Sequence, residues 1–186
     1  FENSGTFAPA TSTFRVGNIW SQQGTFTPGQ STVMFTATTS SITPLTASTT
    51  LDFYNLTFGE TSSAATWVLN KPLNVQGSFT LDKGLLSRGT STITVQNNLS
   101  INASGTITGL ATTTFAGSLS SVWSDATASG TNIGYAVIDG ANKTVTLGSN
   151  VSAQTVTIGA DDTLNASGSG YNMSVIGSWT NNNAFV

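Results

Sequence analysis

The sequence predicts an all-β chain and, within that class, a parallel β-solenoid (β-helix) of stacked short coils. Three observations predict it. First, polar and apolar residues alternate with a period of two in many short runs. Second, these runs are separated by Gly, Asn, Ser and Pro. Third, the sequence repeats at an offset of about 80 residues. Because a coil takes roughly 20 residues, each repeat is expected to form about four coils.

Three similar phrases anchor the repeat. Each consists of an alternating tripeptide that ends in Val, followed four positions later by an anchor residue. The phrases are Phe14–Val16 with Trp20, Ile93–Val95 with Leu99, and Met173–Val175 with Trp179. Their valines are 79 and 80 residues apart. We therefore expect one domain over residues 1–186, with imperfect repeats at 16–94 and 95–174 and partial repeats at 1–15 and 175–186.

The alternating runs give the expected strands in chain order. In the first repeat they lie at 32–35, 51–58, 66–70, 73–81 and 91–96, and in the second at 99–110, 111–115, 133–139, 143–147, 154–159 and 173–177. Thr, Val, Ile and Phe dominate these runs and suit a pleated surface. Apolar spacing of three and four is never sustained, so no helix is expected. The segment 118–132, rich in Ser, Thr and Gly, is expected to be a loop.

The same alternation predicts which side chains point inward. The expected inward residues of the first repeat are Phe14, Val16, Val33, Phe35, Phe53, Leu56, Phe58, Leu73, Val75, Phe79, Leu81, Ile93 and Val95.

Tandem β-sandwich domains are the alternative fold, because they also give a period of about 80–100 residues. The solenoid is favoured because the runs are short, no linker separates the repeats, and stacked coils accommodate ladders of Asn, Ser and Thr.

Composition excludes several classes of function. Charged residues make up 7% of the chain, against roughly 25% in ordinary soluble domains. There is no Cys and no His, so thiolate chemistry and a histidine base are absent. The five Lys and Arg residues are scattered and the net charge is -3, so no nucleic-acid partner is expected. No apolar run approaches the ~20 residues that a membrane-spanning helix needs, so no membrane span is expected. We also expect no cofactor.

The order of the phrases in the first repeat carries a resemblance. "GNIWSQQGTFTPGQSTVMF", then "FYNLTF", then "LNVQGSFTLDKGLLSRGTSTITV" resembles a repeat of large, low-complexity bacterial surface and secreted proteins. That repeat reads approximately G-N-W-x-N-N-G-T-F-x-P-G. The resemblance covers residues 16–95 well and the second repeat loosely, where Leu99 replaces the Trp and Thr108-Gly109 replaces the Pro-Gly turn. It implies a β-helix of adhesin-like or filamentous proteins and no particular activity.

Carboxylates give no clear site. Asp161 and Asp162 are adjacent, and in a strand they would point to opposite faces and could not share a proton. The surrounding "GADDT" suggests a turn, so we interpret the pair as part of a solvated turn. A metal site would need Asp125, Asp139 and this pair to converge from different coils, and their spacing does not select for that. A polysaccharide-cleaving site needs at least two acids in one groove. We therefore predict no catalytic, metal or cofactor residues and no enzymatic activity.

The tryptophans raise the question of carbohydrate stacking. Trp20 and Trp179 share one repeat position, and Trp67 aligns with an aliphatic residue of the second repeat, so all three are expected inside. Trp123 lies in the irregular segment without an aromatic counterpart. It is the expected surface aromatic.

The two ends of the chain lead to the functional hypothesis. Phe1, Gly5 and Phe7 match the phrase that begins at Trp20, and the text from Trp179 to Phe185 repeats it. Uncharged, uncapped strand edges recruit further strands, and a heterologous joint that does not close makes an open filament. The expected assembly residues are Phe1, Gly5, Phe7, Pro9, Trp179, Phe185 and Val186.

We therefore expect a structural subunit of an extracellular filament or fibre at the cell surface or secreted from it, assembling head to tail and serving adhesion or a surface sheath. Its partner would be a second copy of itself, with surface glycans as a further candidate. Two alternatives remain, which are a segment of a long monomeric adhesin stalk and a carbohydrate-binding or carbohydrate-cleaving β-helix.

Overall fold

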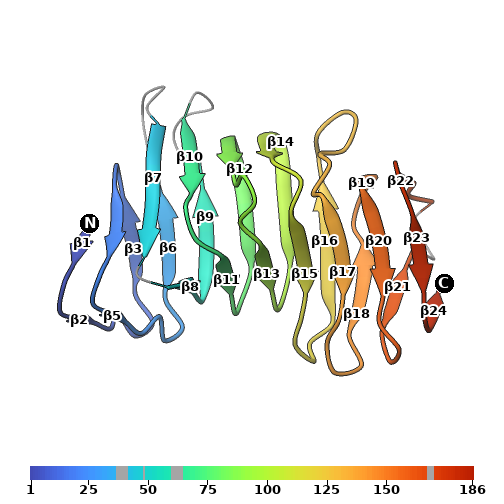
Figure 1. Cartoon of the computed structure of the whole chain (residues 1–186), viewed down its shortest axis with the longest axis horizontal. Coiled ribbons are helices and arrows are strands. Elements are labelled where there is room, and N and C mark those ends of the chain that lie inside the picture. The colour runs from blue at the N-terminus through green and yellow to red at the C-terminus, as the bar shows by residue number, and fades with distance from the viewer. Residues whose placement is uncertain (37–41, 48, 60–64, 167–169) are drawn as a thin grey trace.

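The chain forms an all-β, parallel β-solenoid of about 8 turns. The computed structural model describes residues 1–36, 42–47, 49–59, 65–166 and 170–186, with the backbone alone for 42–44. Its coils stack along one axis, and the N-terminal and C-terminal coils lie at opposite ends (Figure 1). The predicted fold class is confirmed. The tandem-sandwich alternative is wrong, because one sheet runs from the first strand to the last.

Each coil passes through three faces in a fixed order. The first face holds β1 (Glu2–Asn3), β4 (Trp20–Gln22), β7 (Ile42–Ala47), β10 (Thr66–Leu69), the second halves of β12 (Phe79–Ser87) and β14 (Leu99–Thr108), β19 (Val151–Ala153) and β22 (Met173–Val175). The second face holds β2 (Thr6–Phe7), β5 (Thr25–Phe26), β8 (Leu51–Phe53), β11 (Leu73–Val75), β13 (Ile93–Val95), β15 (Thr112–Phe115), β17 (Tyr135–Ile138), β20 (Thr155–Ile158) and β23 (Trp179–Asn181). The third face holds β3 (Thr13–Val16), β6 (Thr32–Phe35), β9 (Asn55–Phe58), the first halves of β12 and β14, β16 (Ser121–Asp125), β18 (Thr144–Leu147), β21 (Thr163–Asn165) and β24 (Ala184–Phe185).

Parallel pairing between neighbouring coils joins the faces into sheets. Within the described residues, a 13-stranded sheet combines the third face with the first face up to β14, because β12 and β14 run through the corner between them, and β19 and β22 pair separately. The second face forms a 7-stranded sheet from β8 to β23. At the corner in β12, Gly84 has φ +83°, and a Cβ there would lie 2.6 Å from the Ala65 carbonyl oxygen. Because glycine has no Cβ, it can adopt this φ and lie this close to the neighbouring carbonyl oxygen.

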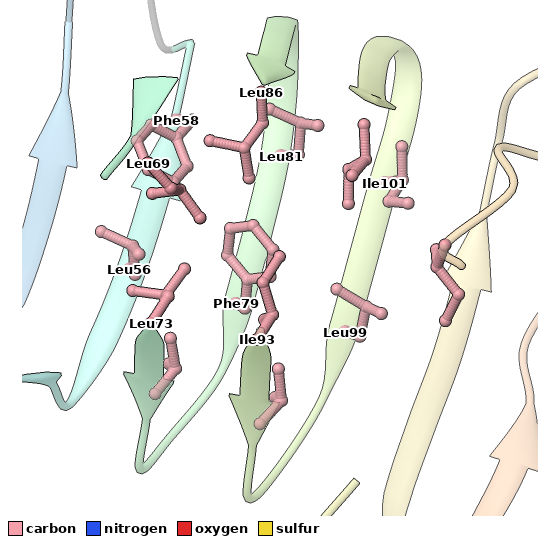
Figure 2. Close-up of a cluster of buried hydrophobic side chains, with 14 of the residues drawn as sticks. Leu56, Phe58, Leu69, Leu73, Phe79, Leu81, Leu86, Ile93, Leu99 and Ile101 are labelled. Atoms are coloured by element: carbon pink, nitrogen blue, oxygen red, sulfur yellow. The ribbon is translucent and has the colours of Figure 1, made fainter. Parts of the chain in front are cut away.

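The core is the interior of the coil, and the predicted alternation sets it. Every expected inward residue is buried except Phe14, which is partly buried because it lies in the first coil. Equivalent positions of adjacent coils stack in line, as Leu56, Phe79 and Leu99 do in Figure 2. Full burial of a Leu or Phe side chain stabilises a fold by about 1.5–3 kcal/mol, so a continuous column of them stabilises the coil strongly.

The three anchor phrases do not occupy equivalent places in the coil. Phe14–Val16 lies on the third face in β3, Ile93–Val95 on the second in β13, and Met173–Val175 on the first in β22. An offset of about 80 residues therefore falls one face short of a whole number of turns. The phrases share a local geometry, which is an alternating strand, a Gly or Asn corner and a new strand.

The expectation of a loop over 118–132 is wrong for its middle part. Residues Ser121–Asp125 form β16, which pairs with β14 and β18 on the third face. Ser121, Trp123 and Asp125 point inward and are buried. The Ser-rich composition suggested a loop, but the pairing with strands on both sides sets the conformation of this segment.

Candidate functional site

A buried arginine crosses the corner between the first and second faces. Arg88 follows β12 in the inward phase set by Leu86, and its side chain is fully buried. Its Nε donates to the Gly109 carbonyl oxygen at 3.0 Å and its Nη1 to Thr113 Oγ1 at 2.6 Å. Its Nη2 donates to the carbonyl oxygens of Ala111 at 2.9 Å and Ile133 at 2.5 Å. One guanidinium thus ties three successive coils together.

The surroundings of Arg88 are polar and neutral. Its four acceptors are three backbone carbonyls and one hydroxyl, so the charge is solvated by dipoles. Burial lowers the pKa of Arg88 to about 10. Gly134 leaves the space that the guanidinium needs, because a Cβ at this position would lie 2.2 Å from Nη2. The arrangement is suited to holding coils in register.

A buried lysine performs a comparable task at the corner between the second and third faces. Lys143 Nζ donates to the carbonyl oxygens of Gln96 at 2.7 Å and Leu119 at 2.5 Å, which belong to the two preceding coils. Burial lowers the pKa of Lys143, and the negative charge of Asp162 raises it in part. Two buried cations therefore bind backbone carbonyls of neighbouring coils at two different corners.

The adjacent aspartates act as acceptors at the same corner. Asp162 is fully buried, so the interpretation as a solvated turn is wrong for this residue. Its carboxylate accepts hydrogen bonds from the backbone N–H of Lys143 at 2.7 Å and Gly140 at 3.1 Å. Asp161 is exposed and accepts from the N–H of Asn142 at 3.2 Å. The pair caps the turn of the preceding coil, and the two carboxylates have separate partners.

Asp125 ends β16 and organises the turn that follows. Its Oδ1 accepts from the N–H of Thr127 at 2.8 Å and from Thr127 Oγ1 at 2.6 Å, and its Oδ2 accepts from the N–H of Thr131. Buried carboxylates need such donors, since an unpaired one is strongly destabilising. Asp125 lies at the corner between the third and first faces, away from Asp161 and Asp162. Among the described residues, no group of three or more acidic side chains is placed to hold a metal ion.

Trp123 is not a surface aromatic. Its side chain is fully buried and its ring packs 5.4 Å from that of Phe115, so that expectation is wrong. The irregular composition around it hid the alternation that turns it inward. Trp20 and Trp67 are also fully buried, as expected, whereas Trp179 is 38% exposed.

The first coil exposes a cluster of three aromatic rings, one from each face. Phe1, Phe7 and Phe14 have ring centroids 5.2–5.3 Å apart, and Phe1 stacks on Trp20 at 4.2 Å. These rings occupy inward positions and pack on the second coil, but their other side is uncovered, whereas in the middle of the stack a coil lies on both sides. Each is only partly buried.

At the other end of the coil, inward positions are likewise uncovered. Trp179 on the second face and Phe185 on the third, which is 49% exposed, have ring centroids 5.0 Å apart. Among the other expected assembly residues, Gly5 is exposed, Pro9 is half-buried and Val186 is 60% exposed.

Amide side chains join neighbouring coils on the outside. Asn74 donates to Asp52 at 2.9 Å and Asn102 donates to Asp82 at 2.6 Å. Two Asn–Asp pairs therefore join adjacent coils on the outer surface. A shallow depression nearer the N-terminus is lined by Glu2, Asn3, Ser4, Ser21 and Gln23. It contains one carboxylate, whereas most glycoside hydrolases use two.

Comparison with protein-family models, with curated proteins and with solved structures gave no match for this chain. Within the part of the chain that the structure describes, there is no helix long and apolar enough to cross a membrane. The molecular class is thus defined by the fold as a β-solenoid repeat protein.

Sequence reasoning missed the roles of Arg88 and Lys143, because it counted them only among five scattered basic residues. A signal for both was available. Each lies two residues from a buried aliphatic residue in the alternation, Arg88 after Leu86 and Lys143 before Val145, so the inward phase assigns both to the interior.

Proposed function

We propose that this chain is a structural unit of an extracellular filament or fibre, in which its coil is continued at both ends by further coils of the same kind. The function would be adhesion or formation of a surface sheath, without a catalytic step. One observation carries the proposal. Inward aromatic side chains that are fully buried in the middle of the stack are left half-exposed on the end coils.

The physical argument concerns the edges of the stacked sheets. An end coil presents unpaired N–H and C=O groups, which another strand can pair with. Here the open edge also carries apolar rings, so pairing would bury them at about 25 cal/mol per Å². Glu2 and Arg15 are the charged side chains on β1 to β3, and β22 to β24 carry none. Charge on an edge strand is a common protection against pairing.

The three faces define the geometry of the proposed joint. If a second copy continues the coil, faces align with like faces, so Trp179 meets Phe7 on the second face and Phe185 meets Phe14 on the third. This pairing replaces the contact of Phe1 with Trp179 that the similar phrases suggest, because those phrases lie on different faces. Such a joint is heterologous and open-ended, so it would make a filament.

Use of the polar groups supports a structural role. The buried ionisable side chains Arg88, Lys143, Asp125 and Asp162 all bind backbone or hydroxyl groups of the coil itself. The resemblance to repeats of bacterial surface proteins supports an extracellular location. In the alternative forms of the proposal, the coils continue covalently in a long adhesin stalk, or the outer surface binds a glycan.

The proposal is tested by sedimentation velocity and negative-stain electron microscopy over a range of protein concentrations. We expect concentration-dependent filaments whose width is that of one coil. Phe7→Lys and Phe185→Lys place a charge at inward positions of the end coils and should leave folded monomers. Thr6→Lys, at an exposed outward position of β2, is the matched control and should still polymerise.

A chain that stays monomeric at all concentrations would reject self-assembly and favour the covalent stalk. Filaments formed equally well by Phe7→Lys would reject the proposed joint. Binding to an array of surface glycans by monomers that form no filament would favour the glycan-binding alternative.

A further inference from the structure

The outer side of the second face carries a regular array of threonines. One column consists of Thr94, Thr114, Val137, Thr157 and Thr180, which are register partners on five successive strands. A second column, two residues earlier in each strand, consists of Thr112, Tyr135 and Thr155. On β13, β15, β17 and β20 these side chains point outward, because the residues next to them along the strand are buried, and Thr180 shares their register.

The spacing of the array is set by the backbone. Neighbouring strands of a sheet lie about 4.7–4.9 Å apart, and alternate residues along a strand are about 6.6 Å apart. Pairing from β8 to β23 continues without a shift of register, whereas the 13-stranded sheet has a shift between Leu81 and Lys83. The second face therefore presents its side chains as a two-dimensional lattice.

The hydroxyl groups of this lattice face solvent. Among the described residues, no hydrogen bond joins the side chains of Thr94, Thr114 or Thr157 to the rest of the chain. By contrast, Thr113, which points inward between two array positions, binds Arg88 and Ile133. Thr is stiff at χ1, so each outward residue offers a hydroxyl and a methyl group in a restricted geometry. Val137 keeps the methyl group.

We propose that this array is a binding surface for ice. From β13 to β23 the columns carry no charge, and the one carboxylate in register with them, Asp52, lies two strands beyond Thr94, so the array matches a neutral partner better than a phosphate, a nucleic acid or an acidic glycan. Ice is a neutral lattice in which every oxygen both donates and accepts hydrogen bonds. The distance between coils is close to the repeat of oxygen atoms along the a axis of hexagonal ice.

Rigidity makes the many weak contacts effective together. A single exposed hydroxyl gains little by exchanging one water for another. An array already fixed at a lattice spacing loses little entropy on binding, so its contacts add, as in other multivalent interactions. The methyl groups order the water next to them and reduce competition from bulk solvent.

The test is adsorption of the purified protein to growing ice, with thermal hysteresis as a second measurement. We expect wild-type protein to be enriched in the ice fraction, and Thr114→Lys and Thr157→Lys to be excluded like an inert protein. Thr57→Lys and Thr146→Lys are matched controls at half-buried outward positions of the third face, and both should adsorb like wild type. Circular dichroism and thermal unfolding verify that all variants are folded.

Exclusion of the wild-type protein from ice would overturn the inference. So would array variants that adsorb normally, or control variants that lose adsorption to the same extent. A parallel sedimentation assay with crystalline cellulose and chitin separates the two kinds of ordered surface. Binding to those solids without binding to ice would assign the array to a polysaccharide instead.

Discussion

Replacing Arg88 by Met should destabilise the coil by about 1–3 kcal/mol. The variant removes four hydrogen bonds from a buried guanidinium but keeps an apolar side chain of similar length. The change in the free energy of unfolding therefore depends on whether each of the four acceptors keeps another hydrogen-bond donor.

The acceptors differ in what they lose. The Ala111 carbonyl oxygen also accepts from the N–H of Tyr135 at 3.1 Å, and the Ile133 carbonyl oxygen also accepts from Thr113 Oγ1 at 2.8 Å. Among the described residues, the Gly109 carbonyl oxygen is left without a donor, and Thr113 Oγ1 loses its donor but still donates to the Ile133 carbonyl oxygen. One orphaned buried carbonyl costs about 1–3 kcal/mol. Removing the cost of burying a charge offsets part of the loss of the other bonds.

Urea unfolding followed by far-UV circular dichroism measures the change in free energy. Lys71→Met, at a partly exposed lysine between β10 and β11, is the control and should change the free energy by no more than about 0.5 kcal/mol. Hydrogen exchange gives a local measurement, because the Tyr135 amide should lose protection when the Ala111 carbonyl moves. If Arg88→Met were as stable as wild type and the Tyr135 amide equally protected, the proposed role of Arg88 in holding the coils would be refuted.

Three further predictions follow from burial. Burial lowers the pKa of Lys143, so the unfolded chain binds more protons between that lowered value and the usual 10.5, and stability should rise with pH through this window. Lys143→Met should weaken the rise in an alkaline series of urea titrations, and the part that remains above about pH 10 is due to Arg88. Trp123→Ala should cost about 3–5 kcal/mol in the same unfolding assay, and Trp179→Ala, at a half-exposed end position, clearly less. Gly134→Ala should cost at least about 1–3 kcal/mol, because φ is +78° and the new Cβ would clash with Arg88, and an unchanged urea midpoint would contradict this geometry.

Much of the fold could be predicted because one rule operates locally. Successive side chains of a strand point to opposite sides, so the alternation in a run such as Leu73–Val75 separates inward from outward residues before any partner strand is known. The same rule applied to Leu86 and Val145 would have placed Arg88 and Lys143 inside. Composition was the weaker guide, and it gave the wrong environment for Trp123 and Asp162.

The proposed sites show where this local rule stops. The outward position of Thr94, Thr114 and Thr157 follows from the alternation, but their alignment in one column follows from the register of β13, β15 and β20. The coils between them differ in length, so no fixed sequence offset connects these residues. The same variation in length separates Trp20 and Trp179, which occupy similar phrases but different faces.

The sequence by itself determined that the chain is built of short strands, which side of each strand is apolar, and where the corners fall. These properties depend on residues next to one another in the chain. The tertiary structure alone decided which of the three faces each strand occupies, which strands are neighbours, and which corner carbonyls meet Arg88 and Lys143. The physical reason is that strands on all three faces have the same alternation of inward apolar and outward polar residues. The pattern therefore does not indicate on which face of the coil a strand lies. Only the stacking of one coil on the next fixes that position.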